Sequence, residues 1–286
     1  MNILLVGGTG AIGRALVPLV SERGHEMTAT TRSRDRAGSL TELGAEPAVV
    51  DALDAAALLR VAQASDPEVV VCQVTSLSGD LSRYAELVAE NARVRSVATA
   101  NTVAAAEAVG ARRLVVQSIA FSYGPGDGPA TEEDPPRDAE PARAAFGTDE
   151  AALASPLDVV VARYGYFYGP GTWYARDGAA VEALKAGTLH AAARGEESLV
   201  HVDDAAGATV ALVEGGDPGI YNVVDDEPAP RIEWMTGLAE AVGAPPPQLG
   251  EPFEAPRRGA SNAKIKRALG WAPAYPSWRE GFQTGL

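Results

Sequence analysis

Short apolar runs alternate with longer stretches of helical periodicity through the first half of the chain. Runs that are apolar at every position are typical of strands buried on both faces of a parallel sheet. The strands predicted in this way cover residues 3–6, 27–31, 47–50, 69–72, 114–116 and 159–161. Helices are predicted between them, including residues 12–23 and the alanine-rich stretch 94–109. This pattern predicts an α/β fold with a Rossmann-type, doubly wound parallel sheet.

The regular alternation ends near Tyr164, and aromatic residues, turns and a proline-rich stretch follow. We therefore expect a smaller C-terminal substrate lobe over the carboxyl ends of the strands. In this division residues 1–165 form an NADP-binding Rossmann core and residues 200–224 return to it. The substrate lobe then consists of residues 166–199 and 225–286.

A glycine-rich turn joins the first predicted strand to the first predicted helix. Such a turn needs residues without a Cβ, and a diphosphate can sit on the free N–H groups at the start of the helix. A plain turn is the alternative, but the strand, the helix and the glycine spacing all agree with dinucleotide binding. The cofactor contacts predicted here are Gly7, Thr9, Gly10, Ala11, Ile12 and Gly13.

The end of the second strand indicates which nicotinamide cofactor is bound. Proteins that bind NAD usually carry an acidic residue there, which holds the ribose hydroxyls. Here the strand runs into Arg32, and Arg34 and Arg36 follow. A guanidinium group suits a 2′-phosphate, so we predict NADP(H), with Arg32 and Arg36 as contacts and NAD(H) as the alternative. A solvated basic turn is the other interpretation of these arginines.

Two carboxylates follow the third strand in the sequence Asp51-Ala52-Leu53-Asp54. A carboxylate at this edge can accept a hydrogen bond from the adenine amino group. Either aspartate can instead cap the next helix. We predict that Asp51 and Ala52 contact the adenine and that Asp54 is the helix cap.

With these motifs the chain resembles the extended short-chain dehydrogenases/reductases, also called the NAD-dependent epimerase/dehydratase family. The resemblance runs over nearly the whole length, and no part of it names a substrate. Besides the glycine turn and Asp51 to Asp54, the matching segments are Gln117 to Gly124, Arg163 to Gly171, His201 to Asp204 and Leu269 to Pro273.

The chain departs from this family where the family's proton chemistry takes place. The resemblance implies a Tyr-x-x-x-Lys pair in the helix after the fifth strand, and no such pair occurs in the chain. One alignment puts Phe146 and Glu150 at those positions, and another puts Pro141 and Ala145 there. Ile119 stands where the family has a catalytic Ser or Thr.

Other side chains near the same edge are candidates for this chemistry. Tyr166 is the first choice for a substitute acid or a substrate contact, although packing under the lobe is the simpler interpretation. Ser118 is the second candidate, and a hydroxyl bonded to the backbone is its alternative. The resemblance puts Tyr164 near the nicotinamide, and alternation would point it to the same side as Tyr166. The resemblance also implies that His201 caps a helix.

Composition narrows the classes of partner. The formal charge of −14 argues against nucleic acid or an anionic membrane surface as the main partner. No apolar run approaches the length of a membrane-spanning helix. Cys72 is the sole cysteine, which fits a cytoplasmic location, and no metal-ligand spacing occurs. We expect a small-molecule substrate and leave a homodimer open.

These observations lead to three hypotheses. The first is an NADP(H)-dependent oxidoreductase or epimerase-like enzyme of atypical type, acting on a small hydroxyl- or carbonyl-bearing substrate. The second is a non-redox isomerase, lyase or cyclase on the same fold. The third is a non-catalytic NADP-binding sensor, for which the loss of the Tyr and Lys would be expected.

Overall fold

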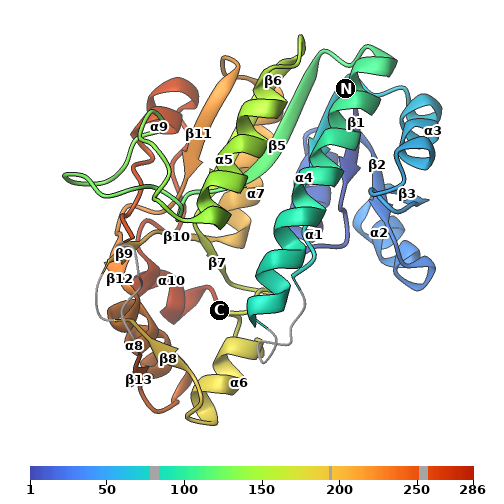
Figure 1. Cartoon of the computed structure of the whole chain (residues 1–286). Coiled ribbons are helices and arrows are strands. Elements are labelled where there is room, and N and C mark those ends of the chain that lie inside the picture. Colours follow the sequence, from blue (N-terminus) through green and yellow to red (C-terminus); the bar gives the residue numbers. More distant parts are fainter. Residues whose placement is uncertain (78–83, 193–194, 251–256) are drawn as a thin grey trace.

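A computed structural model describes residues 1–77, 84–192, 195–250 and 257–286. Its central element is a seven-stranded parallel sheet with the strand order β11-β6-β5-β4-β1-β2-β3 (Figure 1). The strands are β1 (Asn2–Val6), β2 (Glu26–Thr31), β3 (Glu46–Val49), β4 (Val69–Cys72), β5 (Arg113–Ile119), β6 (Asp158–Tyr164) and β11 (Gly219–Val223). The order reverses between β1 and β4, which is where dinucleotides bind in such sheets. The predicted Rossmann-type α/β fold is confirmed.

Helices cover both faces of this sheet. The first face carries α1 (Ala11–Glu22), α2 (Ala37–Leu43) and α7 (Val202–Glu214), and the second carries α3 (Ala55–Ser65), α4 (Tyr84–Val109) and α5 (Glu140–Leu153). Alternate strand residues serve the two faces: Leu5 packs towards α1 and α7, whereas Leu4 and Val6 pack towards α3 and α4. The fully apolar strand runs that we predicted therefore reflect burial on both sides.

The remaining elements form a lobe below the carboxyl ends of the strands (Figure 1). Its strands pair as β7 (Tyr166–Tyr168) with β10 (Leu199–His201), β9 (Glu196–Glu197) with β12 (Ala229–Pro230), and β8 (His190–Ala191) with β13 (Gln248–Leu249). Its helices are α6 (Ala179–Lys185), α8 (Arg231–Val242) and α10 (Trp278–Thr284). Helix α9 (Ala263–Leu269) instead lies beside β11, where Ile265 is buried in the core (Figure 1). Trp234 and Trp278 are buried at the centre of its apolar core.

The chain crosses between core and lobe more than once. β11 joins the main sheet beside β6, and α7 packs against α1, although both lie far along the sequence. The lobe is thus connected to the core at several points along the chain. This arrangement puts lobe residues next to the carboxyl ends of β5 and β6.

Candidate cofactor and substrate site

The glycine turn between β1 and α1 is shaped by close backbone contacts. Gly7 has a φ of 101°, and a Cβ on it would lie 2.9 Å from the carbonyl oxygen of Gln73. A Cβ on Gly13 would lie 2.4 Å from the carbonyl oxygen of Gly8. These two glycines are therefore required by the fold itself.

Gly10 differs from its neighbours because the fold leaves room for a side chain there. Its φ is −74°, and the nearest atom to an added Cβ is the carbonyl oxygen of Gly7 at 3.5 Å. Gly10 is exposed and is the N-cap residue of α1. A glycine that packing does not require is consistent with close approach by a ligand.

The start of α1 has the properties of an anion site. No side chain caps the helix, and its first turn contains no acidic residue. The amides of Ala11 and Ile12 lie in this first turn, where N–H groups have no partner within the helix and the helix dipole favours negative charge. This end of α1 faces the point between β1 and β4 where the strand order reverses.

Two threonines at the end of β2 hold the turn in place. The Thr30 hydroxyl accepts a hydrogen bond from the Gly7 amide at 3.0 Å, and the hydroxyls of Thr9 and Thr31 lie 3.3 Å apart. Arg32 follows directly and is exposed. Arg36 is also exposed, at the end of the short 3-10 helix Arg34–Arg36. The predicted 2′-phosphate contacts thus lie beside the turn.

The aspartates after β3 have separate roles. Asp54 caps α3, because its carboxylate accepts a hydrogen bond from the Ala57 amide at 2.9 Å, which confirms the predicted cap. The exposed Asp51 accepts one from the Leu53 amide at 3.0 Å. Ala52 is buried, and its carbonyl accepts a hydrogen bond from Asn101. The adenine contact of Asp51 and Ala52 stays a prediction.

Tyr164 lies inside the protein rather than at the site surface. Its side chain is 1 % exposed, and its hydroxyl accepts a hydrogen bond from Gln73 at 3.0 Å and bonds to Thr209 at 2.7 Å. Burial raises the pKa of Tyr164 to about 12. The expectation that Tyr164 and Tyr166 share one side is corrected, because β6 ends at Tyr164 and Tyr166 starts a strand of another sheet. The Tyr164 side chain therefore supports the loop after β4 instead of touching a cofactor.

Ser118 is also removed from the site surface. It is 0 % exposed and points towards α4, where its hydroxyl accepts a hydrogen bond from Arg95 at 3.4 Å. The reason is the alternation along β5, in which Val116 and Ser118 face the α3, α4 and α5 layer. We correct the expected substrate contact of Ser118 on this ground.

Neither alignment of the missing Tyr-x-x-x-Lys pair restores a proton-transferring group. Phe146 is buried with the Arg163 guanidinium 3.6 Å from its ring centroid, and Glu150, one turn further along α5, is exposed. In the other alignment Pro141 and Ala145 line a small cavity with Arg95. No phenol or ammonium group is present at either pair of positions.

Arg163 forms a buried ion pair with Asp149. The Asp149 carboxylate accepts a hydrogen bond from Arg163 at 2.8 Å, and both side chains are almost fully buried. Burial raises the pKa of Asp149, although the charge of Arg163 opposes this shift. The pair ties α5 to β6 and is a structural feature of the core.

Tyr166 lies at the junction between core and lobe, among aromatic and basic side chains. Its ring stacks on Phe121 with a centroid distance of 4.2 Å and an interplanar angle of 18°. Its hydroxyl accepts a hydrogen bond from Arg257, and the Arg231 guanidinium lies 5.1 Å from its ring centroid. Trp234 contributes a further ring at 6.3 Å. The half-buried Tyr166 is thus placed to contact a flat ligand.

A buried carboxylate organises the arginines next to Tyr166. Glu197 is 0 % exposed and accepts hydrogen bonds from Arg231 at 2.7 and 2.9 Å, from Trp234 at 3.1 Å, and from Arg257. Burial raises the pKa of Glu197, but the charges of Arg231 and Arg257 outweigh it, so the pKa lies below its usual value. Glu197 therefore stays ionised.

His201 has the structural role that the resemblance implied. It is the N-cap of α7 and accepts a hydrogen bond from the Asp203 amide at 3.2 Å. Its other ring nitrogen is 2.8 Å from the Gly285 carbonyl oxygen. This contact fastens the C-terminal segment to the core.

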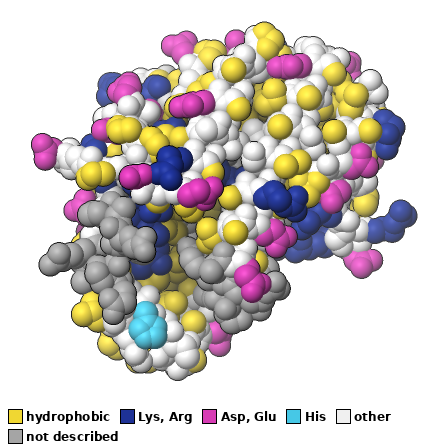
Figure 2. Space-filling view, viewed as in Figure 1, with side chains coloured by type: hydrophobic (Ala, Val, Ile, Leu, Met, Phe, Trp, Pro, Cys, Tyr) yellow, Lys and Arg dark blue, Asp and Glu magenta, His cyan; other side chains and the backbone are white. Residues whose placement is uncertain are grey.

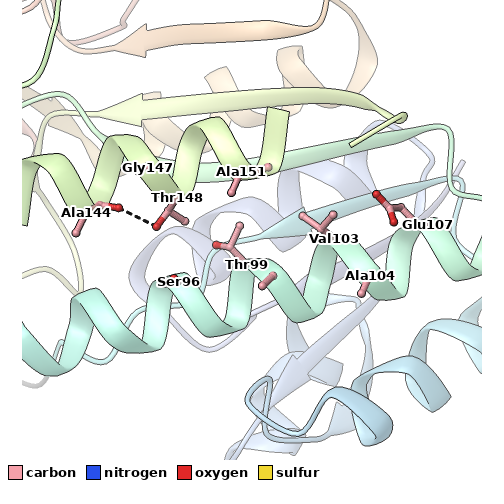
Figure 3. A pocket seen from close by; sticks show the side chains of 11 residues that line it. Ser96, Thr99, Val103, Ala104, Glu107, Ala144, Gly147, Thr148 and Ala151 are labelled. Carbon is pink, nitrogen blue, oxygen red and sulfur yellow. Dashed lines mark hydrogen bonds between the residues drawn. The ribbon is translucent and has the colours of Figure 1, made fainter. Parts of the chain in front are cut away.

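Figure 2 shows a hollow below the Rossmann core in which basic and hydrophobic side chains lie together. A separate cavity of 440 Å³ lies between α4 and α5 (Figure 3). Its lining is mostly small, with Ala144, Gly147 and Thr148 facing Thr99 and Val103, and it contains one charged residue, Glu107. Because it lies away from the glycine turn and lacks clustered polar groups, it is not the candidate site.

Sequence reasoning missed Phe121, Glu197, Arg231, Trp234 and Arg257 as site residues. They come from the loop after β5, from β9, from α8 and from the segment before α9. Glu197 stands in the polar run from Arg194 to Ser198, so nothing in the local sequence indicates that its carboxylate is buried. The arginines that pair with it lie 34 and 60 residues further along the chain.

Among the residues that the structure describes, no helix is both long and apolar enough to cross a membrane. In the same part of the chain, no group of three or more His, Cys, Asp or Glu side chains is arranged to hold a metal ion.

A family model described as NAD(P)H-binding matches residues 7–174, which is more than half of the chain and includes the glycine turn. The chain belongs to this NAD(P)H-binding family. It is also 41% identical over 304 residues to the 3-diazoavenalumate denitrifying reductase of a Streptomyces species, with 98% of this chain and 99% of the relative covered. A second relative is the dTDP-4-dehydrorhamnose reductase of Mycolicibacterium smegmatis, with 26% identity over 307 residues and coverage of 100% and 85%.

Solved structures with the same fold include two UDP-glucose 4-epimerases. The enzyme from Thermotoga maritima has a TM-score of 0.83 and 21% identity, and that from Thermus thermophilus, in complex with NAD, has a TM-score of 0.81 and 26% identity. Each comparison covers 100% of this chain and 97% of the other. The resemblance to the extended short-chain dehydrogenases/reductases is confirmed, and this NAD(P)H-binding family member is a nicotinamide-dependent enzyme of reductase or epimerase type.

Proposed function

We propose that this protein is an NADPH-dependent reductase that removes a diazo group, as dinitrogen, from a small aromatic carboxylic acid. The observation that carries the proposal is a fully formed glycine turn in a chain that lacks the family's Tyr and Lys but has an aromatic cluster around Tyr166. The relative at 41% identity, which matches over nearly its whole length, is named as a denitrifying reductase of a diazo compound.

The chemistry of this reaction explains why a general acid is dispensable. NADPH, when bound, supplies a hydride, which is one hydrogen with two electrons. At the substrate, taken as its aryl diazonium form, the C–N bond breaks and its electron pair leaves with dinitrogen. The hydride's electron pair forms a C–H bond at the same carbon, and its negative charge cancels the positive charge of the diazonium group. No proton enters or leaves, so the protein needs neither a phenol to donate one nor a lysine to adjust the phenol's pKa.

In this proposal the chain's own residues bind and orient the cofactor and the substrate. The amides of Ala11 and Ile12 hold the diphosphate at the start of α1, and Thr9 lines the same turn. Arg32, assisted by Arg36, pairs with the 2′-phosphate, which supports NADPH over NADH. The Asp51 carboxylate accepts a hydrogen bond from the adenine amino group.

The substrate contacts follow from the aromatic junction. The rings of Tyr166, Phe121 and Trp234 form an aromatic cluster, and we expect the aromatic ring of the substrate to pack against its edge. Excluding water from this edge would protect a reactive diazo group and bring the hydride donor close. Tyr166 therefore acts as a substrate contact rather than as an acid.

The test is turnover of a diazo-substituted cinnamic acid by the purified protein with NADPH. Loss of NADPH absorbance should accompany release of one dinitrogen per NADPH oxidised, and mass spectrometry should show hydrogen in place of the diazo group. A protein that binds NADPH but leaves a panel of diazo acids unchanged would contradict the proposal.

The non-redox alternative has one observation in its favour, namely the structural likeness to epimerases. Epimerisation at a hydroxyl-bearing carbon requires proton transfer, for which neither pair of aligned positions offers a group. Conversion of a UDP-sugar without change in NADPH absorbance would favour it.

A further inference from the structure

Arg95 is a buried cation for which neither the core nor the proposed reaction has a use. It lies on α4 and is 7 % exposed, and its Nε has no hydrogen-bond partner. Its Nη2 donates to the Gln117 carbonyl oxygen and to the Ser118 hydroxyl, both at 3.4 Å, which is long for a charged donor. Buried charges are normally paired, yet Arg95 forms no ion pair with any residue that the structure describes.

The charges around Arg95 do not balance. The carboxylate that acts on it belongs to Asp149, which is already paired with Arg163 at 2.8 Å. Burial raises the pKa of the nearby Cys72 thiol, so this group stays neutral. Burial lowers the pKa of Arg95, but a guanidinium starts from so high a value that it keeps its charge near neutral pH. In the described part of the chain, two guanidinium groups therefore share one carboxylate.

The space beside the Arg95 guanidinium is too small for an organic counter-ion. Arg95 lines a cavity of 20 Å³ together with Ala92, Pro141, Ala144, Ala145 and Thr148. This volume suits about one water molecule and excludes a carboxylate or a phosphate. No other side chain of the lining is charged, so the charge of Arg95 can act on a ligand bound nearby.

The order of the strands puts this charge on the side of the sheet that a bound nicotinamide would reach. The adenine contacts that we predict follow β2 and β3, and the diphosphate site lies at the end of β1. A dinucleotide held in this way extends past β1, across the carboxyl ends of β4 and β5. Arg95 bonds to the last turn of β5, where Gln117 donates to the Val74 carbonyl in the loop after β4. The preceding residue, Gln73, packs its carbonyl oxygen against Gly7 of the glycine turn.

We propose that Arg95 is a specificity-determining residue for the redox state of the cofactor, whose buried charge makes the site favour the uncharged nicotinamide ring of NADPH over the cationic ring of NADP⁺. The two forms differ by one positive charge on the ring, so a fixed cation nearby raises the free energy of the oxidised form alone. NADP⁺ therefore binds more weakly and is replaced by NADPH after hydride transfer. The inference goes beyond the proposed reaction, since it needs only a bound nicotinamide dinucleotide.

The experiment compares cofactor binding without turnover. Calorimetry in chloride-free buffer gives the dissociation constants of NADPH and NADP⁺ for native protein and for Arg95→Gln. The readout is the ratio of the two constants, because a purely structural role of Arg95 would weaken both cofactors alike. Arg95→Gln should strengthen NADP⁺ relative to NADPH by about tenfold, the order expected for unit charges about 10 Å apart in a protein. Arg95→Lys keeps the charge and should keep the native ratio.

The matched control is Arg93→Gln, which removes the exposed arginine two residues earlier on α4 and should leave the ratio within about twofold of native. An unchanged ratio in a folded Arg95→Gln variant, equal changes in both affinities, or the same shift in Arg93→Gln would overturn the inference. Circular dichroism reports folding, and Arg95→Met, which fills the space without burying an amide, replaces a Gln variant that does not fold.

The outcome for Arg95 is separate from the outcome for the proposed function. If the chain binds NAD(H) more tightly than NADP(H), the same ratio is measured for NADH and NAD⁺, with the same expected shift. A shifted ratio in a protein that leaves diazo acids unchanged would reject the proposed reaction alone.

Discussion

Gly10→Ala separates what the fold needs from what the cofactor needs. The added methyl group lies 3.5 Å from its nearest neighbour, the Gly7 carbonyl oxygen, and the φ of −74° suits any residue. Replacing glycine by alanine at such a position stabilises a protein by about 0.4–1 kcal/mol through the unfolded chain. Alanine is a poorer N-cap than glycine by roughly the same amount. The two effects nearly cancel, so the melting temperature should stay within about 2 °C of the native value.

Cofactor binding should respond very differently. The methyl group stands on the exposed side of the turn, where a diphosphate must come within hydrogen-bond distance of the Ala11 and Ile12 amides. Loss of one charge-assisted hydrogen bond costs about 1.5–3 kcal/mol. The dissociation constant for NADPH should therefore rise by about 10- to 100-fold in Gly10→Ala.

Gly13→Ala is the matched comparison. Its methyl group would lie 2.4 Å from the backbone oxygen of Gly8, so the turn must shift, at a cost of about 1–3 kcal/mol in stability. Thermal unfolding without ligand and calorimetry with NADPH are measured for both variants. NADPH affinity within about twofold of native in Gly10→Ala, or a loss of stability like that of Gly13→Ala, would refute the reasoning.

Three further predictions concern Arg32, Tyr164 and Tyr166. Arg32→Ala should weaken NADPH binding by about tenfold and leave NADH binding unchanged, because the guanidinium pairs with the 2′-phosphate alone; equal losses for both cofactors in calorimetry, or the same loss in the exposed control Arg60→Ala, would contradict this. The pKa of Tyr164 in the folded protein, about 12, lies above the ordinary tyrosine value of 10.0. The stability that this hydroxyl contributes is therefore complete below pH 10 and is lost as the pH rises towards 12. Denaturant unfolding across this window should show a shallower alkaline decline for Tyr164→Phe than for native protein or Tyr275→Phe, and parallel declines would refute the assignment. Steady-state kinetics of Tyr166→Ala should show KM for the diazo acid raised by about tenfold, whereas Tyr166→Phe should keep its kcat; a collapse of kcat in Tyr166→Phe would mean that the hydroxyl transfers a proton.

The sequence sufficed for the core because the signals there are local. Four consecutive apolar residues in β1 and β4 predict burial on both faces, and glycines at fixed spacing after β1 predict the turn. The seventh strand, β11, was missed as a strand because Tyr221 and Asn222 interrupt its apolar run. Its place beside β6 depends on a partner more than 50 residues away, which no local pattern reveals.

The candidate site was less accessible to sequence reasoning, for two reasons. Alternation along β5 turns Ser118 away from the site, and the direction of that alternation depends on which helices cover which face. Glu197 meets Arg231 and Arg257 across separations of 34 and 60 residues, through the pairing of β9 with β12. Such contacts come from tertiary packing and not from spacing along the chain.

The central claim is direct hydride transfer from the nicotinamide to the carbon that loses nitrogen, without a proton from the protein. It is tested most directly with NADPH deuterated at the 4-position, as each of the two stereoisomers, in ordinary water. The account predicts that one isomer delivers a single deuterium to that carbon, and that the reverse experiment, unlabelled NADPH in heavy water, leaves the same carbon without deuterium. Deuterium arriving from heavy water, or product formed without oxidation of NADPH, would contradict it.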